Sequence, residues 1–168
     1  MSPDDWENKT DSLLNRIYIG KVFETGLLNL IYDGDDIVAV SGIERAHFDK
    51  ENVAIAAKRL YVLRHYRRKY FLHNLFLPSQ LKWAKENNIK LVLITVNEYK
   101  KNNAKLIMDS IITGVGPGGK KYSHLFRIKK FEAHPDKLFI NYCWQYVYKY
   151  FIDKSFEWRI PNEVLHGR

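Results

Sequence analysis

The amino-acid sequence predicts an α+β domain with a mixed β-sheet, in which antiparallel strands flank a central parallel strand–helix–strand unit. Strand-like runs near both ends of the chain favour antiparallel pairing, and an Asp-Gly turn signal separates the first two runs. In the middle, a strand, a helix and a strand follow one another, and such a crossover is right-handed with parallel strands. The chain has 168 residues, 46% of them hydrophobic, so we expect a single domain over residues 1–168.

The individual elements follow from apolar periodicity and turn signals. In chain order, we expect a helix at 4–19, strands at 27–32, 37–44 and 52–63, a helix at 71–87, a strand at 90–96, a helix at 103–112, a loop at 114–121, and strands at 124–131 and 137–151. Pro78 should kink or split the helix at 71–87, because proline lacks an N–H donor.

The last expected strand has one face that is entirely aromatic. This face consists of Tyr142, Trp144, Tyr146, Tyr148 and Tyr150. We expect this face to lie in the core or in an oligomer interface, for example that of a homodimer. We prefer both of these interpretations to an acceptor pocket.

The net positive charge of the chain can be assigned to one stretch, residues 52–85. This stretch holds eight of the 27 Lys and Arg residues and no acidic residue, so the remaining 19 cations equal the 19 Asp and Glu residues. Six of the eight lie between Lys58 and Lys69, where a strand-like run gives way to a helix-like run. The first turn of a helix has free N–H groups and a partial positive charge, so this junction is suited to phosphate.

The charge alone leaves three interpretations open. The phosphate can belong to a small cofactor or to a nucleic acid backbone. Tyr61, Tyr66 and Tyr70 are interspersed among the cations. In a nucleic-acid-binding protein, the cations would contact the phosphate backbone and the tyrosine rings would stack on bases. The third interpretation is a solvated basic surface.

A series of short motifs favours the first of these interpretations, a small phosphate-containing cofactor. In order, the chain contains Leu60-Tyr61-Val62, Tyr66-Arg67, Trp83-Ala84-Lys85 and Asn103-Ala104. Residues 53–112 thereby resemble the GNAT superfamily of acyl-CoA-dependent N-acetyltransferases, and the flanking strands extend the resemblance to most of the chain after about Gly26.

The resemblance implies a GNAT-like fold that transfers an acetyl or other acyl group from acyl-CoA to an amine of a small molecule or peptide. The strand backbone would hold the pantetheine arm, and the basic junction would hold the pyrophosphate. The residues expected to contact acetyl-CoA are Leu60, Tyr61, Val62, Arg67, Arg68, Lys69, Tyr70, Phe71, Asn97 and Asn103.

The sequence departs from the family pattern at the phosphate loop and at the usual acid and base. Tyr70 and Leu72 occupy the two positions where the family has small residues. Met108 falls where many members carry a tyrosine that acts as the acid toward the leaving thiolate. The segment 56–58 falls where many members carry a glutamate that acts as the base.

As replacements, Glu98 and Tyr99 are the catalytic candidates that lie nearest the end of the second central strand, with His65 as a weaker third. A catalytically weak CoA-binding module and a basic nucleic-acid-associated protein are the alternatives to an enzyme.

Other features argue against several classes of function. Cys143 is the only cysteine, which favours a reducing compartment, and we expect a cytoplasmic protein without a membrane span. The six histidines show no metal-ligand spacing, so no metal is expected. Residues 114–120 have the spacing of a Walker A loop, but Lys121 replaces the Ser or Thr that holds magnesium, and we expect no ATP hydrolysis there.

Overall fold

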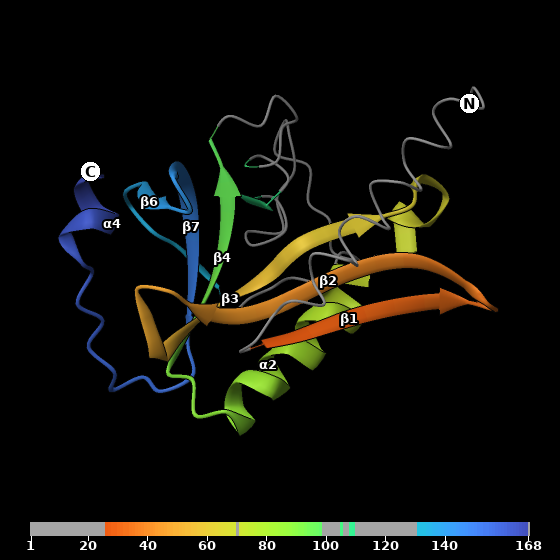
Figure 1. Cartoon of the computed structure of the whole chain (residues 1–168), viewed down its shortest axis with the longest axis horizontal. Coiled ribbons are helices and arrows are strands. Elements are labelled where there is room, and N and C mark those ends of the chain that lie inside the picture. Colours follow the sequence, from red (N-terminus) through yellow and green to blue (C-terminus); the bar gives the residue numbers. More distant parts are fainter. Residues whose placement is uncertain (1–25, 70, 99–104, 106–107, 110–130, 168) are drawn as a thin grey trace.

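The computed structural model describes residues 26–69, 71–98, 105, 108–109 and 131–167 (Figure 1). Within these residues, a seven-stranded sheet has the order β1–β2–β3–β4–β7–β5, and β6 also pairs with β7. The strands are β1 (Gly26–Asp33), β2 (Asp36–Ala46), β3 (Asp49–Val62), β4 (Leu91–Asn97), β5 (Glu132–Ala133), β6 (Leu138–Ile140) and β7 (Cys143–Phe151). β3 and β4 are parallel, and the other strand pairs of the described chain are antiparallel. The predicted mixed sheet with a central parallel pair is confirmed.

Two helical turns and an α-helix connect β3 to β4. A 3₁₀ turn covers Arg64–Lys69, a π-helical turn covers Leu72–Phe76, and α2 covers Leu77–Glu86. Pro78 lies in the first turn of α2, directly after the π-helical turn, and the backbone stays helical through Phe76 and Leu77. The predicted break at Pro78 is therefore the change from π-helical to α-helical geometry.

The sheet buries apolar side chains on both faces. α2 packs on one face, where Ile43, Ala54, Phe76 and Tyr148 belong to one buried cluster. Part of the opposite face is covered by the C-terminal segment, which includes α4 (Asn162–His166) with the buried Val164. Figure 1 shows α2 and α4 at separate parts of the sheet.

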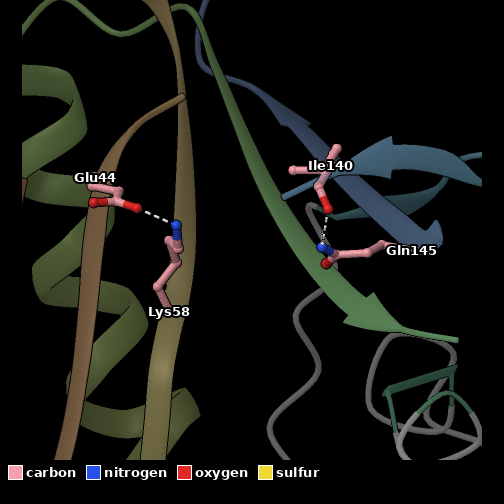
Figure 2. Close-up of polar contacts among 4 residues, drawn as sticks. All are labelled: Glu44, Lys58, Ile140 and Gln145. Atoms are coloured by element: carbon pink, nitrogen blue, oxygen red, sulfur yellow. Dashed lines mark hydrogen bonds and ion pairs between the residues drawn. The ribbon is translucent and has the colours of Figure 1, made fainter. Parts of the chain in front are cut away.

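The expected strand at 137–151 is wrong as a single element. It is a hairpin of β6 and β7, joined at Asn141 and Tyr142, whose φ angles are 53° and 63°. Two successive left-handed residues are typical of a tight hairpin turn. Gln145 closes this hairpin, because its Nε2 donates to the carbonyl oxygen of Ile140 at 2.7 Å (Figure 2).

The turn also changes the expected aromatic face. Tyr142 belongs to the turn and is 79% exposed. Tyr146, Tyr148 and Tyr150 do face the core under the α2 side of the sheet, as expected. Trp144 packs edge-on against Phe139 of β6, with ring centroids 5.4 Å apart.

Several expected elements lie outside the described residues. These are the helix at 4–19, the loop at 114–121, nearly all of the strand at 124–131, and the helix at 103–112 apart from Lys105, Met108 and Asp109.

Candidate functional site

β3 and β4 run side by side over a short ladder and then separate. The parallel ladder runs from the pair Val53–Leu91 to the pair Ala56–Ile94. Beyond it, β3 continues beside β2 and β4 continues beside β7. Figure 1 shows β3 curving away from β4 past this point. We call residues 57–62 of β3 and 95–97 of β4 the strand fork.

Two β-bulges lie in β3 at the strand fork. Between Ile55 and Lys58, β3 has one residue more than the facing part of β2, and the register shifts again between Lys58 and Tyr61. Ala57 and Arg59 have φ angles of 55° and 54°, which are uncommon for residues other than glycine. A bulge bends its strand and increases the local twist, so the bulges give a physical reason for the separation of β3 from β4.

A buried glutamine from α2 supports the first bulge. Gln80 is fully buried, and its Oε1 accepts a hydrogen bond from the Ala57 N–H at 2.9 Å. Its Nε2 donates to Ser41 Oγ at 3.1 Å and to Asn29 Oδ1 at 3.2 Å. Ser41 Oγ donates in turn to the carbonyl oxygen of Lys58 at 3.5 Å. These bonds connect α2 with β1, β2 and β3.

β3 leads directly into the 3₁₀ turn Arg64–Lys69, which we call the basic turn. Arg64, Arg67 and Lys69 are exposed, and none of them forms an ion pair with a carboxylate in the described part of the chain. The backbone of Arg68 belongs to this turn, and its side chain lies outside the description. The exposed charges are therefore available to an anion.

The residues expected to bind the pantetheine arm lie immediately before the basic turn. Leu60, Tyr61 and Val62 are half-buried at the end of β3. Arg67 folds back over them: its Nε donates to the Val62 carbonyl oxygen at 3.0 Å, and its guanidinium lies 5.9 Å from the centre of the Tyr61 ring. The fork and the basic turn are thus one continuous structure.

The tip of the β1–β2 hairpin holds the basic turn. The Tyr66 hydroxyl donates to Asp33 Oδ2 at 2.5 Å, and this hydrogen bond is the main cause that raises the pKa of Tyr66. The Tyr66 ring stacks on Phe71, with centroids 6.4 Å apart. Phe71, an expected cofactor contact, therefore supports the turn from its C-terminal side.

Leu72, which replaces a small residue of the family loop, points into the core. It is 8% exposed and belongs to the cluster that includes Phe76. Its side chain thus occupies core volume instead of covering the basic turn. Tyr70, the other replacement, lies outside the described residues.

Glu98, one of the two expected catalytic candidates, follows the end of β4. Its Oε2 accepts from Lys137 Nζ at 3.0 Å, and its N–H donates to the Trp144 carbonyl oxygen at 3.1 Å. Its side chain is 31% exposed. Tyr99 lies outside the description, and His65 is an exposed residue of the basic turn, on the other arm of the fork.

Asn97 turns toward the β6–β7 hairpin. Its Nδ2 donates to Cys143 Sγ at 3.5 Å, and it pairs with Gln145 across the β4–β7 ladder. Cys143 is half-buried among these polar groups. Asn103, the remaining expected cofactor contact, lies outside the described residues.

Sequence reasoning missed a second carboxylate at the fork. Glu44 of β2 forms an ion pair with Lys58 of β3 beside the bulges (Figure 2). The side chains of Glu44 and Lys58 are 25% and 17% exposed. Because Ile43 packs under α2 and side chains alternate along a strand, Glu44 lies on the opposite face of the sheet.

Position 58 belongs to the segment where the family often carries a glutamate base. Here Lys58 occupies that segment, and the neighbouring strand supplies the carboxylate. The hairpin register, which pairs Gly42 with Lys58, brings the two charges together. The two bulges shift this register, so sequence alternation could not identify the pair.

Met108, which falls where many family members carry a tyrosine that acts as an acid, is a core residue. It is 8% exposed in the cluster under α2. Beside it, Asp109 Oδ1 accepts from the Tyr148 hydroxyl at 2.6 Å, and Asp109 Oδ2 accepts from Lys105 Nζ at 2.5 Å. Burial, followed by the hydrogen bond to Asp109, raises the pKa of Tyr148. This pair supports the aromatic face of β7.

No group of three or more His, Cys, Asp or Glu side chains is placed to bind a metal among the described residues. No helix in the same residues is long and apolar enough to cross a membrane.

Comparisons with solved structures identify the fold. A GNAT-family protein from Desulfovibrio desulfuricans matches with a TM-score of 0.51 at 10% identity, covering 90% of this chain and 83% of that chain. An acetyltransferase from Streptococcus agalactiae matches with a TM-score of 0.52 at 11% identity, over 83% and 76% of the two chains. FeeM, an N-acyl amino acid synthase from uncultured soil microbes, matches with a TM-score of 0.51 at 9% identity, over 90% and 87%.

No protein-family model and no curated protein matches the sequence. The matched proteins have very low sequence identity to this chain, so the matches establish its architecture alone. The chain has the GNAT fold, as the sequence motifs predicted.

Proposed function

We propose that this protein transfers an acyl group from an acyl-CoA to the amine of a small molecule or peptide. The observation that carries the proposal is the strand fork of a GNAT fold leading without interruption into the exposed basic turn. In this arrangement, a strand edge and the exposed basic turn lie at the same end of β3.

The described residues fit an acyl-CoA in two respects. Arg64, Arg67 and Lys69 are exposed and have no carboxylate partner among the described residues, so charge-assisted hydrogen bonds to phosphate would not compete with existing ion pairs. Leu72 points into the core, so its side chain does not cover the turn. Arg68, Tyr70 and Asn103 are proposed as further contacts, as the resemblance implies.

When bound, acyl-CoA supplies an activated thioester carbon. The acceptor amine would attack that carbon after losing a proton, the C–S bond would break, and the thiolate of CoA would leave and take up a proton. Of the described residues, Glu98 and Glu44 are the carboxylates at the fork that can receive the proton. Tyr99, next to Glu98, is proposed as the acid that protonates the leaving sulfur.

The acyl chain and the acceptor stay open in this proposal. FeeM, one of the structural neighbours, is an N-acyl amino acid synthase, so the fold accommodates transfer to amino acids as well as acetylation. A non-catalytic CoA-binding module is the alternative, because both fork carboxylates already have a lysine partner.

A titration with acetyl-CoA by isothermal calorimetry tests the proposal. We expect the double variant Arg64→Ala/Arg67→Ala to lose about 2 to 4 kcal/mol of binding free energy, because each charged hydrogen bond contributes about 1.5 kcal/mol or more.

The matched control is Lys82→Ala/Lys85→Ala, which removes the same charge from exposed positions of α2. It should bind acetyl-CoA like the native chain. Equal losses in both double variants would mean that net charge alone attracts the ligand, and absence of binding by the native chain would refute the proposal.

A further inference from the structure

A fully buried polar side chain lies under the strand fork, and the proposed chemistry does not use it. Gln80 makes three directed hydrogen bonds, to Ala57, Ser41 and Asn29, which satisfy both ends of its amide. A buried amide fixed in this way has one orientation, because any rotation leaves a buried donor or acceptor unpaired.

The group that Gln80 binds is the backbone N–H at the first bulge. A bulge removes a residue from the ladder, so the N–H of Ala57 needs another acceptor inside the protein. Gln80 Oε1 is that acceptor at 2.9 Å. The left-handed φ of Ala57 is unfavourable for alanine, and surrounding contacts must hold it.

The position of this bond coincides with the separation of the strands. The last parallel pair joins Ala56 to Ile94, and Ala57 is the next residue of β3. Ala56 and Ala57 also both pack toward the cluster under α2, although neighbouring residues of a regular strand face opposite sides. The bulge thus redirects β3 at the residue that Gln80 holds.

Gln80 belongs to α2, the helix that follows the basic turn and the π-helical turn. One side chain therefore connects β3 at the fork, which is part of the proposed acyl-CoA site, with the helix that follows the basic turn in the chain. We propose that Gln80 is a positioning residue, which fixes the bulge at Ala57 and thereby sets the opening of the strand fork for acyl-CoA. This inference rests on the proposed function.

The experiment compares Gln80→Met with Val164→Ala in the full chain. Methionine has a similar length, and its thioether sulfur is only a weak acceptor for the Ala57 N–H. Val164 is buried in α4 on the other face of the sheet, and its truncation provides a loss of stability away from the fork. The measurements are amide hydrogen exchange of Ala57 by NMR, the dissociation constant of acetyl-CoA, and the melting temperature.

We expect Gln80→Met to speed the exchange of the Ala57 amide about tenfold beyond any global change, since one hydrogen bond is lost. Acetyl-CoA should bind about tenfold more weakly. Val164→Ala should lower the melting temperature without either effect. Equal loss of affinity in the two variants, or unchanged Ala57 exchange in Gln80→Met, would overturn the role of Gln80.

A third variant, Gln80→Glu, separates positioning from stability. A protonated glutamic acid keeps an acceptor for Ala57 and one donor, and burial favours that neutral form. Relative to the native chain at each pH, its affinity for acetyl-CoA should recover as the pH falls from about 8 to about 6. If the ratio of the two dissociation constants, Gln80→Glu over native, does not change with pH, the proposal is contradicted. Failure of the native chain to bind acetyl-CoA would instead refute the proposed function, whatever the exchange of Ala57.

Discussion

At the scale of single residues, the fork presents two carboxylates in different settings. Glu98 was expected from its place after a central strand, and it pairs with Lys137. Glu44 was not expected, because its relation to Lys58 depends on a register that two bulges shift. The sequence thus locates residues by strand order, whereas contacts across a bulged hairpin need the structure.

The first prediction concerns the proton acceptor. Glu98→Gln should lower the rate of thiol release from acetyl-CoA, with an amine acceptor, by about a hundredfold or more if Glu98 is the general base. Its affinity for acetyl-CoA should stay near the native value, because Glu98 lies on the arm of the fork away from the basic turn. Glu44→Gln is the matched comparison. A large loss in Glu44→Gln with a small loss in Glu98→Gln would transfer the role to Glu44.

The second prediction concerns the hydrogen bond between Tyr66 and Asp33. Tyr66→Phe keeps the stacking on Phe71 and removes the bond, so the basic turn should become less ordered. We expect acetyl-CoA binding to weaken by about 1 kcal/mol, measured by calorimetry. Asp33→Asn, which keeps an acceptor for the tyrosine hydroxyl, should retain most of the affinity. A loss in Asp33→Asn as large as that in Tyr66→Phe would contradict this explanation.

At the scale of elements, strand order and type were predictable, and turns and irregularities were not. The Asp-Gly signal correctly predicted the β1–β2 hairpin, where Asp33 pairs with Asp36. The turn at Asn141 and Tyr142 was missed, because tyrosine is an unusual residue for a left-handed conformation and the alternation continues through it. The bulges of β3 contain no glycine, so no signal at Ala57 or Arg59 marks them.

The third prediction uses the strained backbone of the second bulge. Arg59 is exposed with a φ of 54°, and glycine adopts this conformation without steric cost. Arg59→Gly should therefore raise the free energy of unfolding by about 1 kcal/mol, measured by urea denaturation.

Arg64→Gly removes the same charge where φ is not positive, and it should be neutral or destabilising. Destabilisation by both substitutions would show that Arg59 contributes side-chain contacts larger than the strain that glycine relieves.

At the scale of the molecule, the sheet buries apolar side chains on both faces, and the basic turn lies at the end of β3. α2 covers one face, and α4 with its preceding segment covers part of the other. Six of the eight cations of residues 52–85 lie in the basic turn and on α2, and the other two, Lys58 and Arg59, lie in β3. Motif order was sufficient to predict the GNAT fold, because strand, turn and helix alternate in sequence as they do in space.

The fourth prediction concerns stability at alkaline pH. The pKa of Tyr148 is raised above its ordinary value of about 10 by burial and by Asp109, so the folded state retains the proton that the unfolded state loses. This contribution is fully present below about pH 10 and is lost as the pH rises through the folded-state pKa.

The free energy of unfolding should thus fall steeply above about pH 10 in the native chain and less steeply in Tyr148→Phe. Tyr66 contributes in the same direction, so the slope decreases without disappearing. Tyr32→Phe, an exposed position on β1, is the control. Identical slopes in Tyr148→Phe and the native chain would show that Tyr148 keeps an ordinary pKa.

The most direct test of acyl-CoA binding at the strand fork is an NMR titration of the labelled full chain with acetyl-CoA. We predict that the largest backbone shifts fall on residues 57–62 and 64–69, with smaller ones at 95–98, while α4 stays unchanged. A titration with a short single-stranded DNA should give weaker shifts, which salt reduces strongly. No shifts with millimolar acetyl-CoA, or shifts confined to the outer surface of α2 around Lys82 and Lys85, would contradict the account.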